Sequence, residues 1–490
     1  MIQNSPIKRF RWFGLLLIAT LLVLIFRFPA IAQTPLHYTE LEFPPLEEIT
    51  IPEYERYQLE NGMVVYLMED HQLPLVKGNA IIKTGSRLEP DQKVGLAEIT
   101  GTVMRAGGTK EHPADQLNEL LEQRAAQVET SISKTSGNAG FNTLSEDLDL
   151  VFKLFGEVIR NPAFAPEQLA LAKTQQRGSI SRRNDDPGDI ASRELRQLVY
   201  GENSPYARIE EYATIDNITR EDVVTFHQTY LRPDSMILGV VGDFDPETMK
   251  TLIQETFGDW EPPTPSPTIA VPSAEQEYDQ GVFLVNQPQL NQSSILMGHL
   301  GGKLDSPDYP ALSVMNGLLN GFGGRLYNDL RSRQGLAYSV YGYWSASYDY
   351  PGLFIAGGQT RSETTVQFIQ SLMKEIERVR TTPIAPEELA YAKESILNSF
   401  VFKFENPSQT LSRLMTYEYY GYPENFIFEY QKGVKATTIE DIQRVAQTYL
   451  QPEQVVTLVV GNEEAINPPL SQLGKNVQTV DVKIPEGGKS

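Results

Sequence analysis

The chain has 490 residues, 40% of them hydrophobic and 21% charged, a composition typical of a globular protein of two to four domains and not of a disordered one. Its formal net charge of −21 disfavours nucleic acid and anionic lipid surfaces as partners. The absence of cysteine excludes disulfides, thiolate metal sites and a cysteine nucleophile.

The first predicted element is an export leader over residues 1–32. Three basic residues between positions 8 and 11 precede an apolar run over 12–26, and Ala-Ile-Ala at 30–32 forms a cleavage signal. The apolar run is shorter than the roughly 20 residues that span a bilayer. We expect a cleaved signal peptide, with an uncleaved membrane anchor as the alternative. Either outcome makes the protein exported, periplasmic or otherwise extracytoplasmic, and membrane contact is expected only through an uncleaved leader.

Local patterns after the leader predict both strands and helices. Asn61-Gly62 is a hairpin signal between strands expected over 56–59 and 63–68. Apolar residues between 148 and 159 recur at intervals of three and four, which predicts an amphipathic helix. Pro166 is typical of the first turn of a further helix.

An internal repeat organises the chain. Residues 221–245 align without gaps on 440–464, and ten of the 25 positions are identical. Residues 165–173 match 385–393 at seven of nine positions. The two offsets, 219 and 220, are nearly equal. This agreement indicates a domain of about 220 residues that has been duplicated.

A Pro-rich stretch marks the boundary between the two copies. We expect a first domain over 50–260, a linker over 261–275 and a second domain over 276–480. Because strands alternate with helices in each copy, the predicted class is α+β, with two homologous α/β-sheet domains after the N-terminal signal segment.

One segment resembles an active-site helix. The run Gly95-Leu96-Ala97-Glu98-Ile99-Thr100-Gly101-Thr102 is similar to G-L-A-H-x-x-E-H, the zinc-binding helix of the pitrilysin/insulin-degrading-enzyme family of metallopeptidases. In that family the two histidines hold zinc and the glutamate activates the attacking water. Here Glu98 and Thr102 replace the histidines, and Gly101 replaces the glutamate.

The family's third zinc ligand, a glutamate on a later helix, is also missing. The matching place, around Thr174, is filled by Lys173-Thr174-Gln175-Gln176, and no glutamate occurs between Glu167 and Glu194. None of the five histidines has a second one at the spacing of a helix pair. We therefore predict that this chain binds no metal and no other cofactor. An autonomous peptidase with an unusual metal site at Glu98 is an alternative.

A second resemblance lies in the second copy. Residues 325–340 are similar to the family's segment R-L-x-x-x-L-R-x-x-x-G-L-A-Y-S-V. The resemblance implies that Arg331 and Tyr338 correspond to a pair that hydrogen-bonds the substrate carbonyl and stabilises the oxyanion. The alternative from the residues alone is a surface ion pair for Arg331 and a strand cap for Tyr338.

Two weaker patterns accompany these motifs. Residues 128–133 resemble the strand whose edge pairs with substrate in active members, although an ordinary sheet strand explains them equally well. The aromatic-rich stretch 338–350 is expected to be half-buried core or, alternatively, the lining of a peptide chamber.

The resemblance covers nearly the whole mature chain and implies two related domains that face one another, with two such chains closing a chamber around an unfolded peptide. It extends to mitochondrial processing peptidase and respiratory core subunits. We predict a zinc-free, non-catalytic subunit of an exported insulinase-like peptidase. It forms a heterodimer with a catalytic H-x-x-E-H subunit that holds the zinc, and no nucleic acid is involved. A structural or peptide-holding core-type subunit is the alternative.

Overall fold

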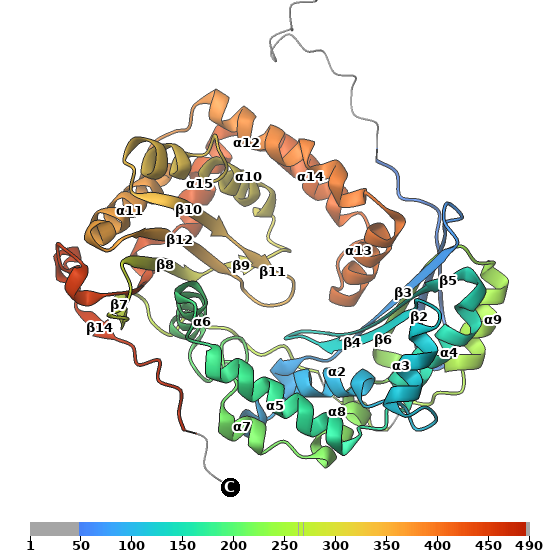
Figure 1. The fold of residues 1–490 in the computed structure, drawn as a ribbon. Helices are drawn as coiled ribbons and strands as arrows, with labels where there is room; N and C mark the ends of the chain where they lie inside the picture. The colour runs from blue at the N-terminus through green and yellow to red at the C-terminus, as the bar shows by residue number, and fades with distance from the viewer. Residues whose placement is uncertain (1–48, 263, 268, 487–490) are drawn as a thin grey trace, which may run out of the picture. The chain divides into compact units, whose positions relative to one another are not determined.

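The computed structural model describes residues 49–262, 264–267 and 269–486, so the predicted leader lies outside the described residues (Figure 1). Two six-stranded mixed sheets organise the chain. From Ile51 onwards the chain forms one compact unit. No helix within the described ranges is long and apolar enough to cross a membrane.

The described residues of the first half form one sheet and a set of α-helices. Its strands are β1 (Glu55–Gln58), β2 (Val64–Glu69), β3 (Leu75–Ile82), β4 (Gln127–Ile132), β5 (Gly137–Leu144) and β6 (Met236–Gly242). Its helices are α2 (Leu96–Ala106), α3 (Ala114–Glu122), α4 (Leu148–Arg160), α5 (Pro166–Arg182), α6 (Pro187–Tyr200), α7 (Tyr212–Asp216), α8 (Arg220–Tyr230) and α9 (Pro246–Phe257).

The second half is likewise built from strands and helices. Its strands are β7 (Gly281–Asn286), β8 (Gln292–Leu300), β9 (Gly302–Lys303), β10 (Ala337–Trp344), β11 (Ala346–Ser347), β12 (Leu353–Arg361), β13 (Val456–Gly461) and β14 (Val477–Thr479). Its helices are α10 (Tyr309–Leu319), α11 (Thr365–Thr381), α12 (Pro386–Asn398), α13 (Pro407–Tyr420), α14 (Phe426–Ala436) and α15 (Ile439–Tyr449), together with a π-helix over Tyr327–Arg333.

The two large sheets share one topology. The first has the order β1-β2-β6-β3-β5-β4 and the second β10-β12-β8-β13-β7-β14. The inner pairs β2–β6 and β7–β13 are parallel, and the strands that follow toward β4 and β10 are antiparallel. Only the outermost strand differs, because β1 comes from the start of the first half and β14 from the end of the second. The duplicated α+β fold predicted from the repeat is confirmed.

Local signals explain several elements. The Asn61-Gly62 hairpin is present: β1 and β2 pair antiparallel from Gln58 and Val64 outward, and Gly62 has a φ of +94° that favours glycine. Helices α8 and α15 each begin with a capping box, made by Thr219 and Asp222 in the first copy and by Thr438 and Asp441 in the second.

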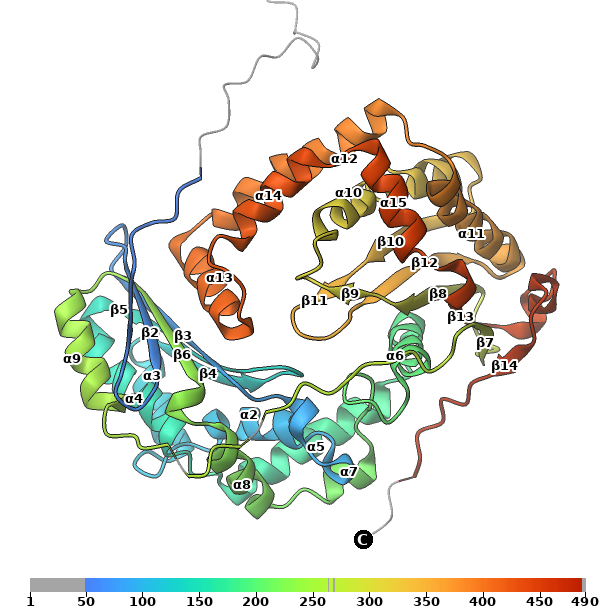
Figure 2. The same ribbon diagram turned by 180° about the vertical axis from the view of Figure 1, so that it is seen from behind.

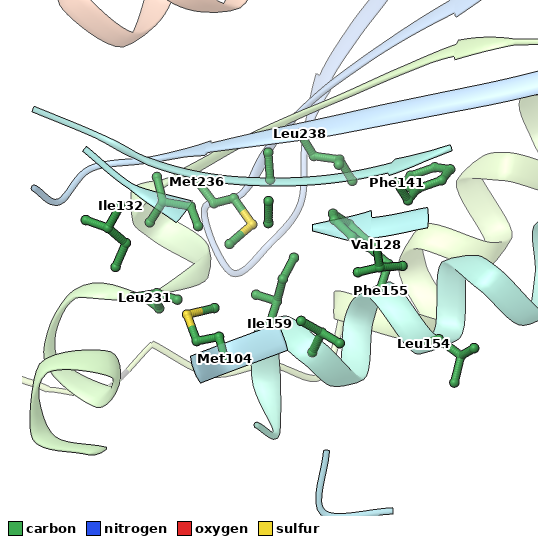
Figure 3. Packing of buried hydrophobic residues seen from close by; sticks show 14 of the residues in the cluster. Met104, Val128, Ile132, Phe141, Leu154, Phe155, Ile159, Leu231, Met236 and Leu238 are labelled. Carbon is green, nitrogen blue, oxygen red and sulfur yellow. The ribbon is translucent and has the colours of Figure 1, made fainter. Parts of the chain in front are cut away.

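The first hydrophobic core lies between the first sheet and the helices α2 to α4. The spacing predicted for residues 148–159 is confirmed, since the apolar face of α4 is buried. Phe155 of α4 lies 5.1 Å from Phe141 of β5, measured between ring centroids, and Val128 of β4 belongs to the same buried cluster (Figure 3). This packing fixes β4 and α2, the two elements that form the candidate site.

Each half also lends one helix to the other half's sheet (Figures 1 and 2). Leu195 of α6 is buried with Leu458 of β13, and Met415 of α13 is buried with Ile237 of β6. Pro187 at the start of α6 and Pro407 at the start of α13 are 220 residues apart, so the exchange follows the duplication. The two sequence copies are therefore interlocked.

Candidate functional site

Helix α2 presents the degenerate zinc positions on one exposed face. Ile99, Val103 and Met104 are buried in the core, so Glu98 and Thr102, one turn apart, are left on the exposed side. The carboxylate of Glu89 accepts hydrogen bonds from the backbone nitrogens of Gly95 and Ala97, at 3.1 and 2.9 Å. A carboxylate at this position accepts hydrogen bonds from the free N–H groups at the start of the helix, and its negative charge interacts favourably with the positive end of the helix dipole.

Gly101 lies against the edge strand β4. A Cβ atom on Gly101 would lie 2.5 Å from the backbone nitrogen of Ile132 and 3.0 Å from the Cα of Ser131. The Thr130 hydroxyl donates to the Gly101 carbonyl oxygen at 2.6 Å and holds the strand in place. The space that a general base would need at this position is therefore occupied by backbone.

Helix α5 contributes Gln176 to Glu98. The Gln176 side-chain nitrogen donates to Glu98 Oε1 at 2.6 Å. Thr174, the residue selected from the sequence, is exposed and donates instead to the Ala170 carbonyl oxygen of its own helix. Gln176 lies within the run predicted to replace the third ligand, but the family spacing gives a range of positions, and only the helix phase selects Gln176 among them.

The residues at this place do not fit a zinc ion. A tetrahedral site needs three or four thiolate, imidazole or carboxylate ligands. Close to the two altered ligand positions of α2 are the Glu98 carboxylate, the Gln176 amide and the Thr102 hydroxyl, together with the Glu210 carboxyl that interacts with Glu98. Within the described ranges, no group of three or more His, Cys, Asp or Glu side chains is arranged to hold a metal ion.

A pocket of about 410 Å³ adjoins the exposed face of α2, and three glutamates line it. Burial raises the pKa of Glu89 to about 7. Burial, together with the nearby charges of Glu98 and Glu89, raises the pKa of Glu210 to about 8. Glu210 comes from the loop before α7, and no sequence signal connected it with Glu98. A carboxyl that keeps its proton at neutral pH is a hydrogen-bond donor and a poor metal ligand.

The cations beside this pocket are committed to other groups. Arg208 donates to the backbone oxygens of Ser86 and Glu89, at 2.6 and 2.8 Å. Arg183 donates to the Glu210 backbone oxygen and to the Glu211 carboxylate. These bonds leave the Glu210 carboxyl without a guanidinium that would lower its pKa.

The histidines of the described residues lie apart from one another. His71 contacts Asp243, His112 contacts Glu157, His227 contacts the Ile159 carbonyl oxygen, and His299 contacts the Leu300 carbonyl oxygen. Each is explained by its own local partner. His37 lies outside the described residues.

Arg331 and Tyr338 lie together on the second half. The Arg331 guanidinium carbon is 4.7 Å from the Tyr338 ring centroid and 4.8 Å from the Tyr327 ring centroid. Tyr338 is 81% exposed. No carboxylate among the described residues lies within 4.0 Å of Arg331, so the surface ion pair considered from the sequence is not formed there. A guanidinium in contact with two rings keeps its N–H donors for a ligand.

The aromatic stretch 338–350 has two different surroundings. Tyr341 and Tyr343 stack on each other in β10, at 5.6 Å. The loop after β11 instead contacts the first half: Tyr350 stacks on Tyr206 at 4.1 Å, and Asp349 accepts a hydrogen bond from the buried Arg87 at 2.6 Å. This end of the stretch joins the two halves.

Comparison with known proteins agrees with the fold. Residues 64–208 match the family model described as Insulinase (Peptidase family M16), and residues 217–396 match the model described as Peptidase M16 inactive domain. The fold and the altered helix thus define an insulinase-type protein without the zinc motif. The chain belongs to peptidase family M16, the insulinase family.

Its relatives are distant but cover most of the chain. An uncharacterized zinc protease, YmxG of Bacillus subtilis, is 24% identical over 73% of this chain and 86% of its own length. A Helicobacter pylori protein named non-peptidase homolog YmxG is 23% identical over 81% of this chain and 91% of its own length.

Solved structures show the same fold. A peptidase M16 inactive domain from Pseudomonas fluorescens has a TM-score of 0.76 at 22% identity, covering 85% of this chain and all of that one. The periplasmic protease PqqL of Escherichia coli has a TM-score of 0.71 at 15% identity, covering 88% of this chain and 49% of that one.

Proposed function

We propose that this chain is the zinc-free subunit of an exported insulinase-like peptidase. It pairs with a catalytic subunit that carries an intact H-x-x-E-H helix and the zinc ion, and it contributes Arg331 and Tyr338 to hydrolysis of unfolded peptides. The observation that carries the proposal is the contrast between the two halves. The metal positions on α2 lack suitable ligands, whereas the Arg331 guanidinium is held in place without an ion-pair partner.

The relatives support parts of this proposal. The Helicobacter pylori relative is named a non-peptidase homolog, which is compatible with a chain that lacks its own activity. The Escherichia coli structural neighbour is periplasmic, which supports export, as does the basic and apolar leader.

The residues of this chain would act by positioning and by charge. Arg331 would donate N–H groups to the substrate carbonyl oxygen as negative charge develops on it, and the Tyr338 hydroxyl would add a further donor. Tyr327 and Tyr338 fix the guanidinium plane, so little reorganisation is needed at the moment of reaction. The partner would activate the water molecule.

Reconstitution with the partner tests the proposal. The partner to be tested is a chain of the same family with an intact H-x-x-E-H helix, to be sought first in the reading frames beside this one. Arg331→Ala should lower the kcat/KM of the complex by about 10²- to 10³-fold, the usual effect of losing an oxyanion donor. Arg333→Ala is the matched control, because Arg333 is 66% exposed and already paired with Asp329. Equal activity of the Arg331→Ala complex and the native complex would remove the proposed role.

A further inference from the structure

An exposed aromatic surface surrounds Arg331. We call it the Arg331 platform and define it as Phe322, Tyr327, Arg331 and Tyr338. Phe322 is 79% exposed, and its ring meets the Tyr327 ring edge-on at 5.1 Å. The Arg331 guanidinium lies in cation–π contact with both Tyr327 and Tyr338. The platform therefore offers a half-buried positive group close to a large apolar ring that is open to solvent.

The charge on the platform is not neutralised by its neighbours. Asp329, the acidic residue of the same π-helix, is bound by Arg333 at 2.9 Å and by the Gln334 amide at 2.9 Å. Arg331 is thus a local positive charge on a protein of net charge −21. A planar guanidinium with free donors is the side chain best matched to a carboxylate, which it binds through two parallel hydrogen bonds.

The strand beside the platform limits what can occupy it. Strand β10 lies at the edge of its sheet, but the polar backbone groups of Gly342 and Trp344 are already bonded. Asn320 donates to and accepts from Gly342, at 2.7 and 3.0 Å, and Asn316 does the same with Trp344, at 2.9 and 2.8 Å. A peptide cannot add along the full length of β10. Backbone pairing is left to the first part of β10, near Tyr338, where a short segment or a chain end can bind.

We propose that the Arg331 platform binds the C-terminal α-carboxylate of a peptide whose last side chain is apolar, with that side chain resting on Phe322 and Tyr327. This inference rests on the proposed function and names the product that the site retains. In hydrolysis the water oxygen bonds to the scissile carbonyl carbon, the C–N bond breaks, and both water protons end on the amine, which leaves as an ammonium group. The oxyanion position thereby becomes the carboxylate of the N-terminal product.

The isolated full-length chain provides the test, because the partner is not needed for this binding. The probes are a fluorescent N-acylated tetrapeptide ending in phenylalanine, as free acid and as C-terminal amide, and the same peptide ending in glycine. Anisotropy titration should show the phenylalanine acid binding at least about tenfold more tightly than its amide, since the amide lacks the charge for the bidentate contact. Phe322→Ala should weaken binding of the phenylalanine acid but not of the glycine acid.

Variants at the cation complete the experiment. Arg331→Met should remove the preference for acid over amide, Arg331→Lys should keep part of it, and Arg333→Met should leave it unchanged. Equal binding of acid and amide to the native chain, or no binding of either, overturns the inference without requiring any variant to fold. If that occurs while the reconstituted complex still depends on Arg331, the proposed function stands and only the carboxylate site fails.

Discussion

A Cβ atom on Gly101 would lie 2.5 Å from the backbone nitrogen of Ile132, closer than real Cβ atoms approach such atoms. Helix α2 and strand β4 are thus in backbone contact where a catalytic glutamate would need space. We predict that Gly101→Ala lowers the free energy of unfolding by about 1–3 kcal/mol, because the strand must move. Urea unfolding followed by circular dichroism measures this change.

Gly178 is the matched control for that variant. It also lies within a helix, α5, but a Cβ there would meet only the Arg182 side chain, at 4.0 Å. Gly178→Ala should therefore stabilise the chain by about 0.5–1 kcal/mol through helix propensity. Equal effects at the two glycines would show that the contact with β4 is not tight.

The ion pair between Arg87 and Asp349 joins the two halves. Arg87 is buried, with 4% of its side chain exposed, and Asp349 is 17% exposed. Asp349→Asn should lower the free energy of unfolding by about 2–4 kcal/mol, because it leaves an uncompensated buried guanidinium. The control is Asp305→Asn, which breaks an exposed pair with Lys303 and should change stability by less than about 0.5 kcal/mol. Comparable losses of unfolding free energy in the two variants would contradict the burial of Arg87.

His227 makes the fold sensitive to acid. Burial lowers the pKa of this imidazole to about 4, whereas the unfolded chain titrates near the ordinary value of about 6.5. The unfolded state therefore binds more protons between these values, so this stabilisation is present above pH 6.5 and is lost as the pH falls toward 4. The loss amounts to about 2–4 kcal/mol.

A non-titrating side chain isolates this contribution. His227→Gln retains a donor for the Ile159 carbonyl oxygen. Its unfolding free energy should be lower than that of the native chain at pH 7, and the difference should shrink toward pH 4.5. A difference that stays constant over this range would rule out the depressed pKa.

Glu210 produces the opposite dependence. Its pKa is raised to about 8 by burial and by Glu98 and Glu89, so the folded state binds more protons than the unfolded state between about pH 4.5 and 8. Stability from this group is therefore greatest at low pH and is lost as the pH rises through 8. The free energy of unfolding of Glu210→Gln, relative to that of the native chain, should rise by on the order of 1–2 kcal/mol from pH 5 to pH 8.5. This value is reduced for partial solvent exposure. Thermal melts at both pH values measure the gain, and a loss at high pH would refute it.

Helices and strands whose own residues form a recognisable local pattern could be predicted from the sequence. The Asn61-Gly62 hairpin and the amphipathic spacing of α4 were sufficient for their elements. The exchange of α6 and α13 was not predictable, since an apolar stripe shows that a helix face is buried but not which sheet covers it.

The same distinction between local pattern and long-range packing applies to the candidate site. The missing ligands at Glu98, Gly101 and Thr102 follow from residue identity alone. The contacts of Glu98 with Gln176 and Glu210 depend on the packing of α5 and of a loop more than 100 residues away, and no local signal encodes them.

The central claim is that this chain cannot hold a catalytic zinc ion. The most direct measurement is metal analysis of the purified full-length chain after incubation with Zn²⁺ and desalting, combined with an assay of unfolded-peptide cleavage by the same sample. We predict far less than one zinc ion per chain and no cleavage. One tightly held zinc ion per chain, with turnover of peptide and no partner present, would contradict the account.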